Sequence, residues 1–145
     1  MRDAIRFPLA KKVVLVTGAG GYLGSQLIAA LAAGRVEVSR VVAADVREVP
    51  PERRLPGIEY VQADVRSPAL IPLFDQWKVD VVVHLAAKTH DMAEAPGVEA
   101  GYQRVNVEGT RRLLAASVRA GVKRVVFVSS VKVIDEAEFH KLLGK

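Results

Sequence analysis

The stretch Val13-Val14-Leu15-Val16-Thr17-Gly18-Ala19-Gly20-Gly21-Tyr22-Leu23-Gly24 decides the fold of this 145-residue chain. Its apolar start, rich in β-branched residues, predicts a buried strand over about residues 12–17. A glycine-rich turn ends that run. Apolar residues then recur at helical spacing and predict a helix over about residues 22–33, with Gly34 as its stop. The residues that set this spacing are Tyr22, Leu23, Leu27, Ile28 and Leu31.

The junction between this strand and this helix has the properties of a phosphate site. The first N–H groups of a helix lack intrahelical partners and carry a partial positive charge, and glycine lets a phosphate come close to the backbone. Thr17, Gly18, Gly21 and Gly24 follow the spacing Thr-Gly-x-x-Gly-x-x-Gly. A purely structural turn also explains such glycines, but the strand before and the helix after favour dinucleotide binding.

Composition narrows the class of protein. The chain is 50% hydrophobic and has no cysteine, which predicts one domain over residues 1–145 without disulfides or a thiolate metal site. The N-terminus is too charged for a signal peptide and no apolar run is long enough for a membrane span, so we expect a soluble, cytoplasmic protein. The net charge of +5 comes from scattered basic residues without interleaved aromatic residues, which argues against nucleic acid as a partner.

Further apolar runs alternate with helical patterns along the chain. Strands are expected over about residues 41–45, 58–63, 79–85 and 125–129. Helices are expected from Ser67-Pro68 to about Trp77, with an irregular start because of Pro72, and over about residues 102–120. Residues 1–11 are expected to be a lead-in, and residues 49–57 and 88–101 to be loops. This alternation predicts an α/β fold, a doubly wound parallel sheet of about five strands (Rossmann fold).

Several stretches together resemble the extended short-chain dehydrogenases/reductases, the NAD-dependent epimerase/dehydratase family. In chain order they are Thr17–Gly24, Asp45, Asp64-Val65, His84-Leu85-Ala86-Ala87, Asn106-Val107-Glu108-Gly109-Thr110 and Val128-Ser129-Ser130. The order and separations fit the family from about residue 12 to about residue 133. The resemblance therefore implies a dinucleotide cofactor, and it implies a role for each residue that matches.

By this resemblance, two acidic residues would face the adenosine half of the cofactor. Asp45 would accept hydrogen bonds from the ribose hydroxyls and repel a 2′-phosphate, so NAD is favoured over NADP, although Arg47 softens this preference because guanidinium binds phosphate well. The alternative is a solvated residue at the strand end. Asp64 would accept from the adenine amine beside the apolar Val65, or would instead cap a turn.

The segment after the fourth expected strand would lie against the cofactor. Ala86 and Ala87 are small enough for phosphates and ribose to approach the backbone, whereas His84 is expected to be a buried, hydrogen-bonded side chain rather than a catalytic one. Asn106 would link the long helix to that strand. The cofactor contacts expected are Gly18, Gly20, Gly21, Tyr22, Leu23, Gly24, Asp45, Val46, Arg47, Asp64, Val65, Leu85, Ala86, Ala87, Lys88 and Asn106. No metal is expected, because His90 and Asp91 lack a third ligand at suitable spacing.

The catalytic part of the family pattern is incomplete. Ser130, preferred over Ser129, would position the substrate. In the family a later Tyr-x-x-x-Lys pair transfers the proton, because the lysine lowers the pKa of the tyrosine. None of the three tyrosines in this chain has a lysine four positions later. The tail over residues 131–145 also departs from the pattern, so we expect a truncated chain that keeps the cofactor half and lacks the C-terminal substrate region.

Three functions remain open at this point. A full-length parent would be an NAD-dependent epimerase, dehydratase or reductase that acts on a nucleotide-sugar-like substrate by hydride transfer. This chain alone would bind the dinucleotide without turnover, and this is the interpretation that we favour for it. The alternative is a non-enzymatic regulator or partner-binding module, and the fold alone does not decide. The apolar stripe of Val107, Leu114 and Val118 predicts the long helix over residues 102–120. The resemblance also implies a homodimer through this helix.

Overall fold

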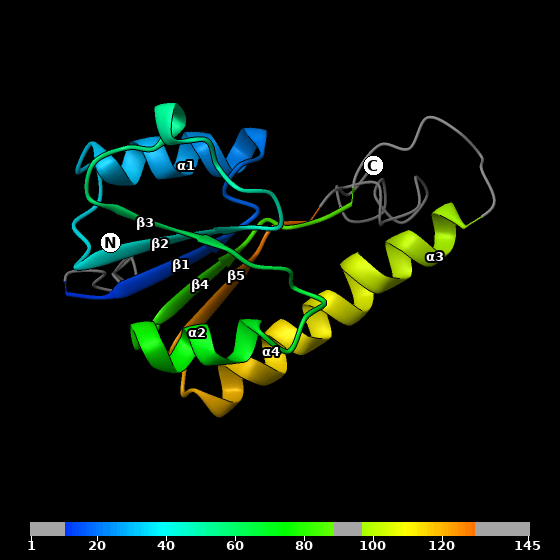
Figure 1. Ribbon diagram of the computed structural model, residues 1–145. Helices are drawn as coiled ribbons and strands as arrows, with labels where there is room; N and C mark the ends of the chain where they lie inside the picture. Colours follow the sequence, from blue (N-terminus) through cyan, green and yellow to red (C-terminus); the bar gives the residue numbers. More distant parts are fainter. Residues whose placement is uncertain (1–10, 89–96, 130–145) are drawn as a thin grey trace, which may run out of the picture.

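The computed structural model describes residues 11–88 and 97–129, which form a parallel sheet covered by helices (Figure 1). The elements in chain order are β1 (Val13–Thr17), α1 (Tyr22–Ala32), β2 (Arg40–Asp45), a 3₁₀ turn η1 (Pro51–Arg53), β3 (Ile58–Gln62), α2 (Leu70–Trp77), β4 (Val81–His84), α3 (Val98–Tyr102), a π-helical segment η2 (Gln103–Gly109), α4 (Thr110–Arg119) and β5 (Arg124–Phe127). The predicted α/β fold is confirmed.

The strand order β3-β2-β1-β4-β5 positions the site. All neighbouring strands are parallel, and Thr17 at the end of β1 lies in register with Ala44 of β2 on one side and His84 of β4 on the other. From β1 the chain first builds outward through β2 and β3 and then returns to add β4 and β5. The connections therefore diverge between β1 and β4, and sheets of this kind bind ligands in the crevice at the carboxyl ends of such strands.

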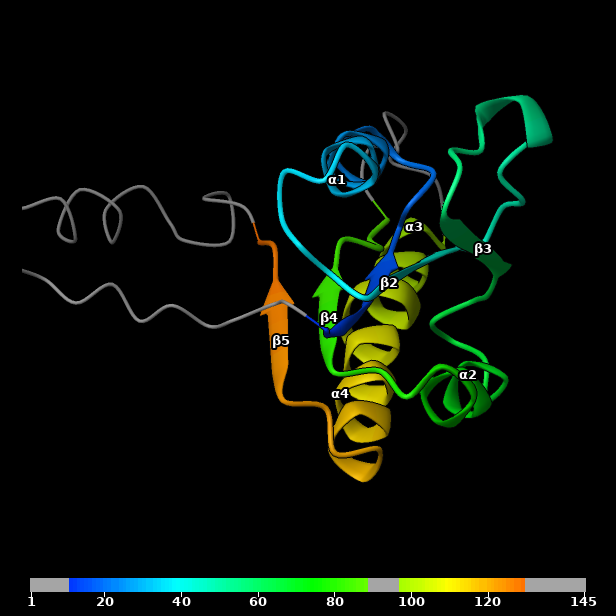
Figure 2. The same ribbon diagram turned by 90° about the vertical axis from the view of Figure 1, so that its left-hand side faces the viewer.

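Helices cover both faces of the sheet, with α1 on one side and α2 and α4 on the other (Figure 2). Alternate residues of β1 serve the two cores: Val14 and Val16 pack in the cluster with Ile28 of α1, and Leu15 packs in the cluster with Phe74 of α2. A strand buried on both faces needs apolar residues at successive positions. This is why β1, β2 and β4 have nearly continuous apolar sequences.

The ends of two helices follow the sequence prediction. Gly34, at a φ of +69°, donates its N–H to the Leu31 carbonyl and ends α1, and Gly121, at a φ of +71°, ends α4 in the same way. The predicted first helix begins at Tyr22 as expected, but its first two residues are not part of the core. Tyr22 is 81% exposed and Leu23 is 58% exposed, because both lie at the end of α1 that faces the open edge of the sheet.

The long helix differs from the prediction in three respects. It begins at Val98, so the loop expected over residues 88–101 is wrong at its C-terminal end, and its middle is the π-helical η2. Its core-facing residues are Leu113 and Ala116, whereas the predicted stripe of Val107, Leu114 and Val118 is exposed. An apolar stripe at helical spacing identifies a face but not what covers it.

Two smaller features refine the predicted boundaries. Ser67 starts the turn before α2, its Oγ accepting from the Ala69 N–H at 3.2 Å, but the regular helix begins only at Leu70, with Pro72 in its first turn. Part of the loop expected over residues 49–57 is the 3₁₀ turn η1. Within residues 11–88 and 97–129, no helix has the length and apolar character that crossing a membrane requires.

Candidate functional site

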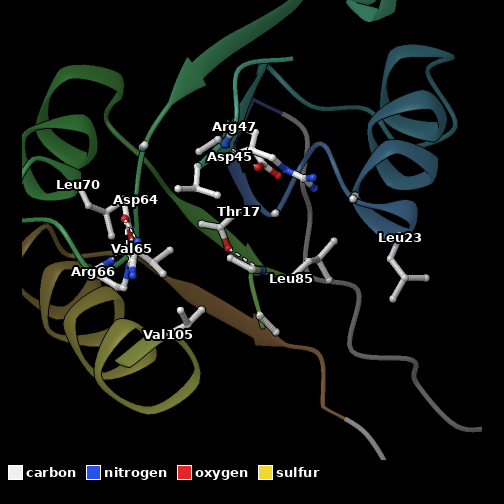
Figure 3. A pocket seen from close by; sticks show the side chains of 18 of the residues that line it. Thr17, Leu23, Asp45, Arg47, Asp64, Val65, Arg66, Leu70, Leu85 and Val105 are labelled. Atoms are coloured by element: carbon white, nitrogen blue, oxygen red, sulfur yellow. Dashed lines mark hydrogen bonds and ion pairs between the residues drawn. The ribbon is translucent and has the colours of Figure 1, made fainter. Parts of the chain in front are cut away.

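A cavity of about 390 Å³ lies where the carboxyl ends of β1, β2, β3 and β4 meet (Figure 3). Four segments that are far apart in the sequence contribute to its walls, together with the π-helical segment η2. The lining residues are Thr17, Gly18, Gly21, Tyr22, Leu23, Gly24, Ala44, Asp45, Val46, Arg47, Ala63, Asp64, Val65, Arg66, Leu70, Leu85, Ala86, Ala87 and Val105. Most of the residues that the sequence singles out are therefore brought to one place.

The glycine turn forms one wall of this cavity, and its close contacts require glycine at two positions. Gly18 has a φ of +72°, and a Cβ on it would lie 2.7 Å from the Ala86 nitrogen. A Cβ on Gly24 would overlap the Gly18 carbonyl oxygen and lie 2.7 Å from the Ala19 Cα. No side chain of the described residues caps the start of α1, so its first N–H groups remain available at the cavity wall.

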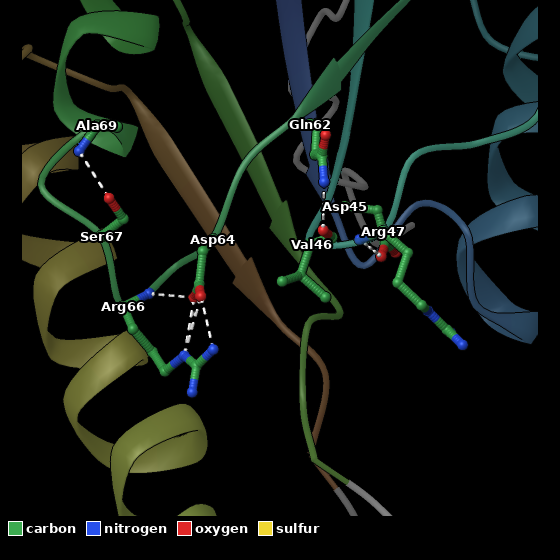
Figure 4. Close-up of polar contacts among 8 residues, drawn as sticks. All are labelled: Asp45, Val46, Arg47, Gln62, Asp64, Arg66, Ser67 and Ala69. Carbon is green, nitrogen blue, oxygen red and sulfur yellow. Dashed lines mark hydrogen bonds and ion pairs between the residues drawn. The ribbon is translucent and has the colours of Figure 1, made fainter.

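Asp45 closes the end of β2 beside the glycine turn. Asp45 is only 7% exposed. Its carboxylate accepts two backbone hydrogen bonds: Oδ2 from the Gly20 N–H at 2.9 Å and Oδ1 from the Arg47 N–H at 3.0 Å. The alternative of a solvated strand-end residue is therefore wrong. The Arg47 side chain extends away from Asp45 (Figure 4), and within the described part of the chain its guanidinium has no ion-pair partner.

Asp64 lies at the opposite end of the cavity, where Arg66 holds its carboxylate (Figure 4). Oδ1 accepts from the Arg66 backbone N–H at 2.8 Å and from Nε at 3.0 Å, while Oδ2 accepts from Nη2 at 2.7 Å. The hydrogen bonds from the Arg66 side chain lower the pKa of Asp64 below its ordinary value. The backbone contact is the turn cap that the sequence left open as an alternative role for Asp64.

Apolar side chains flank Asp64 and shape this end of the cavity. Val65 and Leu70 are buried, at 6% and 1% exposure, and Val105 approaches from η2. Figure 3 shows these three side chains gathered near the Asp64–Arg66 pair and apart from Asp45. A slot with apolar walls and a polar rim suits a flat heteroaromatic ring.

His84 lies beneath the cavity as the centre of a buried hydrogen-bond chain. Its Nδ1 is 2.7 Å from Thr17 Oγ1, and its Nε2 is 2.9 Å from Thr110 Oγ1. Thr17 Oγ1 also accepts from the Ala86 N–H at 3.3 Å, which connects this chain of hydrogen bonds to the segment after β4. Burial lowers the pKa of His84. The prediction of a buried and hydrogen-bonded histidine is confirmed.

Asn106 bridges η2 to the segment after β4. Its Oδ1 accepts from the Lys88 N–H at 2.7 Å, and its Nδ2 donates to the Lys88 carbonyl at 3.1 Å. The linking role expected for Asn106 is confirmed. Three of the expected cofactor contacts do not line the cavity: Gly20, Lys88 and Asn106. Gly20 is part of the glycine turn that forms one wall, and Asn106 holds the backbone of Lys88, next to the lining residue Ala87.

Sequence reasoning missed several lining residues: Thr17 as a cavity residue, Ala44, Ala63, Arg66, Leu70 and Val105. The sequence does contain a signal for Arg66, because an arginine two residues after an aspartate on a turn can reach the carboxylate of that aspartate. The sequence contains no signal for Val105, since the position of this residue depends on the π-helical register of η2.

Ser130, His90 and Asp91 lie outside the described residues. Within the described ranges, no three acidic or histidine side chains are grouped as a metal site would need.

Comparisons with known proteins agree with this geometry. The model of the NAD dependent epimerase/dehydratase family matches residues 14–141. An uncharacterised protein of Mycobacterium tuberculosis is 39% identical over 87% of this chain and 34% of its own length, and the dTDP-D-glucose 4,6-dehydratase of Mus musculus is 32% identical over 84% of this chain and 36% of its own.

Among solved structures, the UDP-glucose-4-epimerase of Stenotrophomonas maltophila with bound NAD and formylated UDP-arabinopyranose has a TM-score of 0.71 at 31% identity, covering 84% of this chain and 38% of that one. The chain thus spans about a third of the length of the relatives it matches. The fold, the cavity at its carboxyl edge and the match over residues 14–141 place this chain in the NAD-dependent epimerase/dehydratase family.

Proposed function

We propose that this chain is an NAD-binding module whose glycine turn holds the cofactor diphosphate. The observation that carries the proposal is the convergence at one cavity of the glycine turn, Asp45, Asp64-Val65 and Ala86-Ala87. These segments are separated by tens of residues, and only the parallel sheet brings their ends together. The uncapped start of α1 offers N–H groups and the positive end of the helix dipole to an anion.

The proposed binding mode assigns the adenosine half to the β2 and β3 ends of the cavity. The adenine lies in the slot formed by Val65, Leu70 and Val105, with the Asp64–Arg66 pair at its rim. The ribose lies at Asp45, whose carboxylate keeps one further acceptor position on each oxygen for the two hydroxyls. A 2′-phosphate would meet this negative charge, so NAD binds more tightly than NADP.

For a longer protein that contains this chain, we propose hydride transfer on a nucleotide-sugar-like substrate. The support is that the mouse relative is named as a dTDP-D-glucose dehydratase and that the similar epimerase was solved with NAD and a UDP-sugar. The nicotinamide would supply the hydride chemistry, and Ser130 would position the substrate. Because the sequence contains no Tyr-x-x-x-Lys pair, we propose that this chain binds cofactor without turnover.

We further propose that two copies associate through the long helix. Val107, Leu114 and Val118 are 41%, 44% and 82% exposed on the surface of η2 and α4 that faces away from the sheet. Apolar residues at this spacing, exposed together on one helix, fit a helix–helix contact with a second copy.

An NADH titration tests the cofactor proposal. Nicotinamide fluorescence should change saturably in the wild-type chain, and Gly21→Val should weaken binding by at least about tenfold, because a side chain there obstructs the approach of a phosphate to the backbone. A Cβ on Gly21 meets only the Gly18 oxygen, at 3.3 Å, and the φ of Gly21 is −75°, so the fold should persist.

Ala32→Val is the matched control, because it adds a branched side chain to an exposed residue at the other end of α1, away from the glycine turn. Its NADH affinity should equal that of the wild type. A wild-type chain that shows no saturable binding at millimolar NADH, or a Gly21→Val chain with unchanged affinity, would contradict the proposal. A stable protein partner without cofactor binding would instead favour the non-enzymatic, partner-binding alternative.

A further inference from the structure

Asp45 makes contacts that its expected role at the ribose does not require. A carboxylate that only receives ribose hydroxyls would need no partner in the protein. Here Oδ2 accepts from the Gly20 N–H at 2.9 Å, and Oδ1 accepts from the Arg47 N–H at 3.0 Å, in a residue only 7% exposed. Asp45 therefore joins the end of β2 to the middle of the glycine turn before any ligand is bound.

The turn has few other bonds that fix its shape. Gly21 donates to the Gly18 carbonyl at 3.2 Å, and Ala19 donates to the Ala44 carbonyl at 3.1 Å. The Gly20 N–H lies between these two donors and is held by the Asp45 side chain alone among the described residues. A Cβ on Gly20 would lie 3.2 Å from Oδ2, so a side chain there would press on this carboxylate.

We propose that Asp45 is a positioning residue for the diphosphate turn, in addition to its contact with the ribose. It fixes Gly20 and so keeps the backbone of residues 18–21 in the conformation that receives a phosphate. The inference rests on the proposed function, which supplies the ligand. A carboxylate has about four acceptor positions, and the two backbone bonds use two of them, so one side chain can hold the turn and bind the ribose at once.

The two roles predict different ligand dependences. If Asp45 acted at the ribose alone, its removal would weaken NADH but leave inorganic pyrophosphate unaffected. If Asp45 also holds the turn, its removal weakens pyrophosphate as well as NADH. The reason is that a turn already held in its binding conformation does not have to be ordered by the ligand when the ligand binds.

The experiment uses the ¹⁵N-labelled 145-residue chain without cofactor and compares wild type with Asp45→Ala. Hydrogen exchange at the Gly20 amide should become at least about tenfold faster in Asp45→Ala, because the hydrogen bond that protects it is gone. Titration with inorganic pyrophosphate, followed by the amide shifts of residues 18–24, should give a dissociation constant at least about threefold higher.

Asp80→Ala is the matched control, because its carboxylate also accepts from a backbone N–H, that of Val13 at 3.0 Å, but at the opposite edge of the sheet from the glycine turn. It should leave Gly20 exchange and pyrophosphate binding unchanged. If Asp45→Ala fails to fold, Asp45→Asn replaces it: the amide has one acceptor oxygen, so either the Gly20 or the Arg47 N–H should exchange faster.

Unchanged Gly20 exchange and unchanged pyrophosphate affinity in Asp45→Ala would overturn the positioning role, even if NADH binding were lost. Failure of the wild-type chain to bind NADH would instead overturn the proposed function, and the Gly20 exchange rate, measured without ligand, would still decide whether Asp45 holds the turn.

Discussion

Gly24 and Gly21 belong to one motif, but the structure gives them separate tasks. The Cα of Gly24 lies so close to the Gly18 carbonyl and to Ala19 that any side chain would push on backbone atoms. Gly21 has open space apart from the Gly18 oxygen at 3.3 Å. The sequence pattern identified both positions without separating the glycine needed for packing from the glycine that we propose to lie against the ligand.

This distinction gives a prediction for Gly24→Ala. Its methyl group must displace the turn, so we expect the free energy of unfolding to fall by about 1–3 kcal/mol or more. Gly21→Ala should change it by no more than about 0.5 kcal/mol. Urea denaturation of the two variants beside the wild type provides the measurement. Equal stability for the two variants would contradict the packing role of Gly24.

His84 predicts a dependence of stability on pH. Because burial lowers the pKa of His84 in the folded state, the unfolded chain binds this proton more readily than the folded chain does once the pH falls below about 6.5. The folded state therefore loses stability as the pH drops through that region, by at most about 1.4 kcal/mol per pH unit for one group. Asp64 has no part in this window, since its pKa is lowered from 3.8.

His84→Gln removes the titrating group while keeping a polar side chain. The difference in unfolding free energy between wild type and His84→Gln should shrink as the pH falls from about 7.5 to 5.5, as followed by urea denaturation at several pH values. Parallel pH profiles for the two proteins would show that His84 does not stay neutral in the fold. Arg111, on the exposed side of α4, offers a control site where Arg111→Gln should leave the profile unchanged.

At the scale of elements, the strands were predicted more accurately than the long helix. Each strand has a local signal, a short apolar run, and its boundaries in the structure fall within about two residues of the prediction. The π-helical η2 has no such signal. Residues of η2 contact residues that are distant in the sequence: Asn106 bonds to Lys88, and Gly109 lies against Val65. The spacing of apolar residues within the helix does not predict such contacts.

The bridge from Asn106 to Lys88 predicts a cost for its removal. Asn106→Leu keeps the side-chain volume but leaves the Lys88 N–H and carbonyl without these partners, so we expect a loss of about 1–3 kcal/mol of unfolding free energy. The Lys88 amide should also exchange faster. Gln103→Leu, a polar-to-apolar change on the exposed surface of the same segment, is the control. If both variants were equally stable, the bridge would carry no stability.

At the scale of the whole molecule, the sequence predicted the sheet and most of the cavity wall because the fold places the ends of parallel strands side by side. It could not predict how the wall residues pair with one another. The Asp64–Arg66 pair and the double contact of Asp45 depend on side-chain directions that follow from the assembled backbone.

The exposed stripe on the long helix predicts self-association. Val118→Glu places a charge at the most exposed position of the stripe, at 82% exposure, and should convert a dimer to a monomer in sedimentation velocity. Val36→Glu puts the same charge on an exposed valine away from that helix and should leave the dimer intact. A wild-type chain that sediments as a monomer at every concentration would contradict the proposed dimer.

The central claim is that a dinucleotide lies with its diphosphate against the backbone of the glycine turn. A crystal structure of the chain grown with NAD measures this directly. We predict density for the diphosphate within hydrogen-bond distance of backbone N–H groups in residues 18–24, with the adenosine directed toward Asp45 and Val65. Density for the nucleotide at any other surface, with this cavity holding only solvent, would contradict the account.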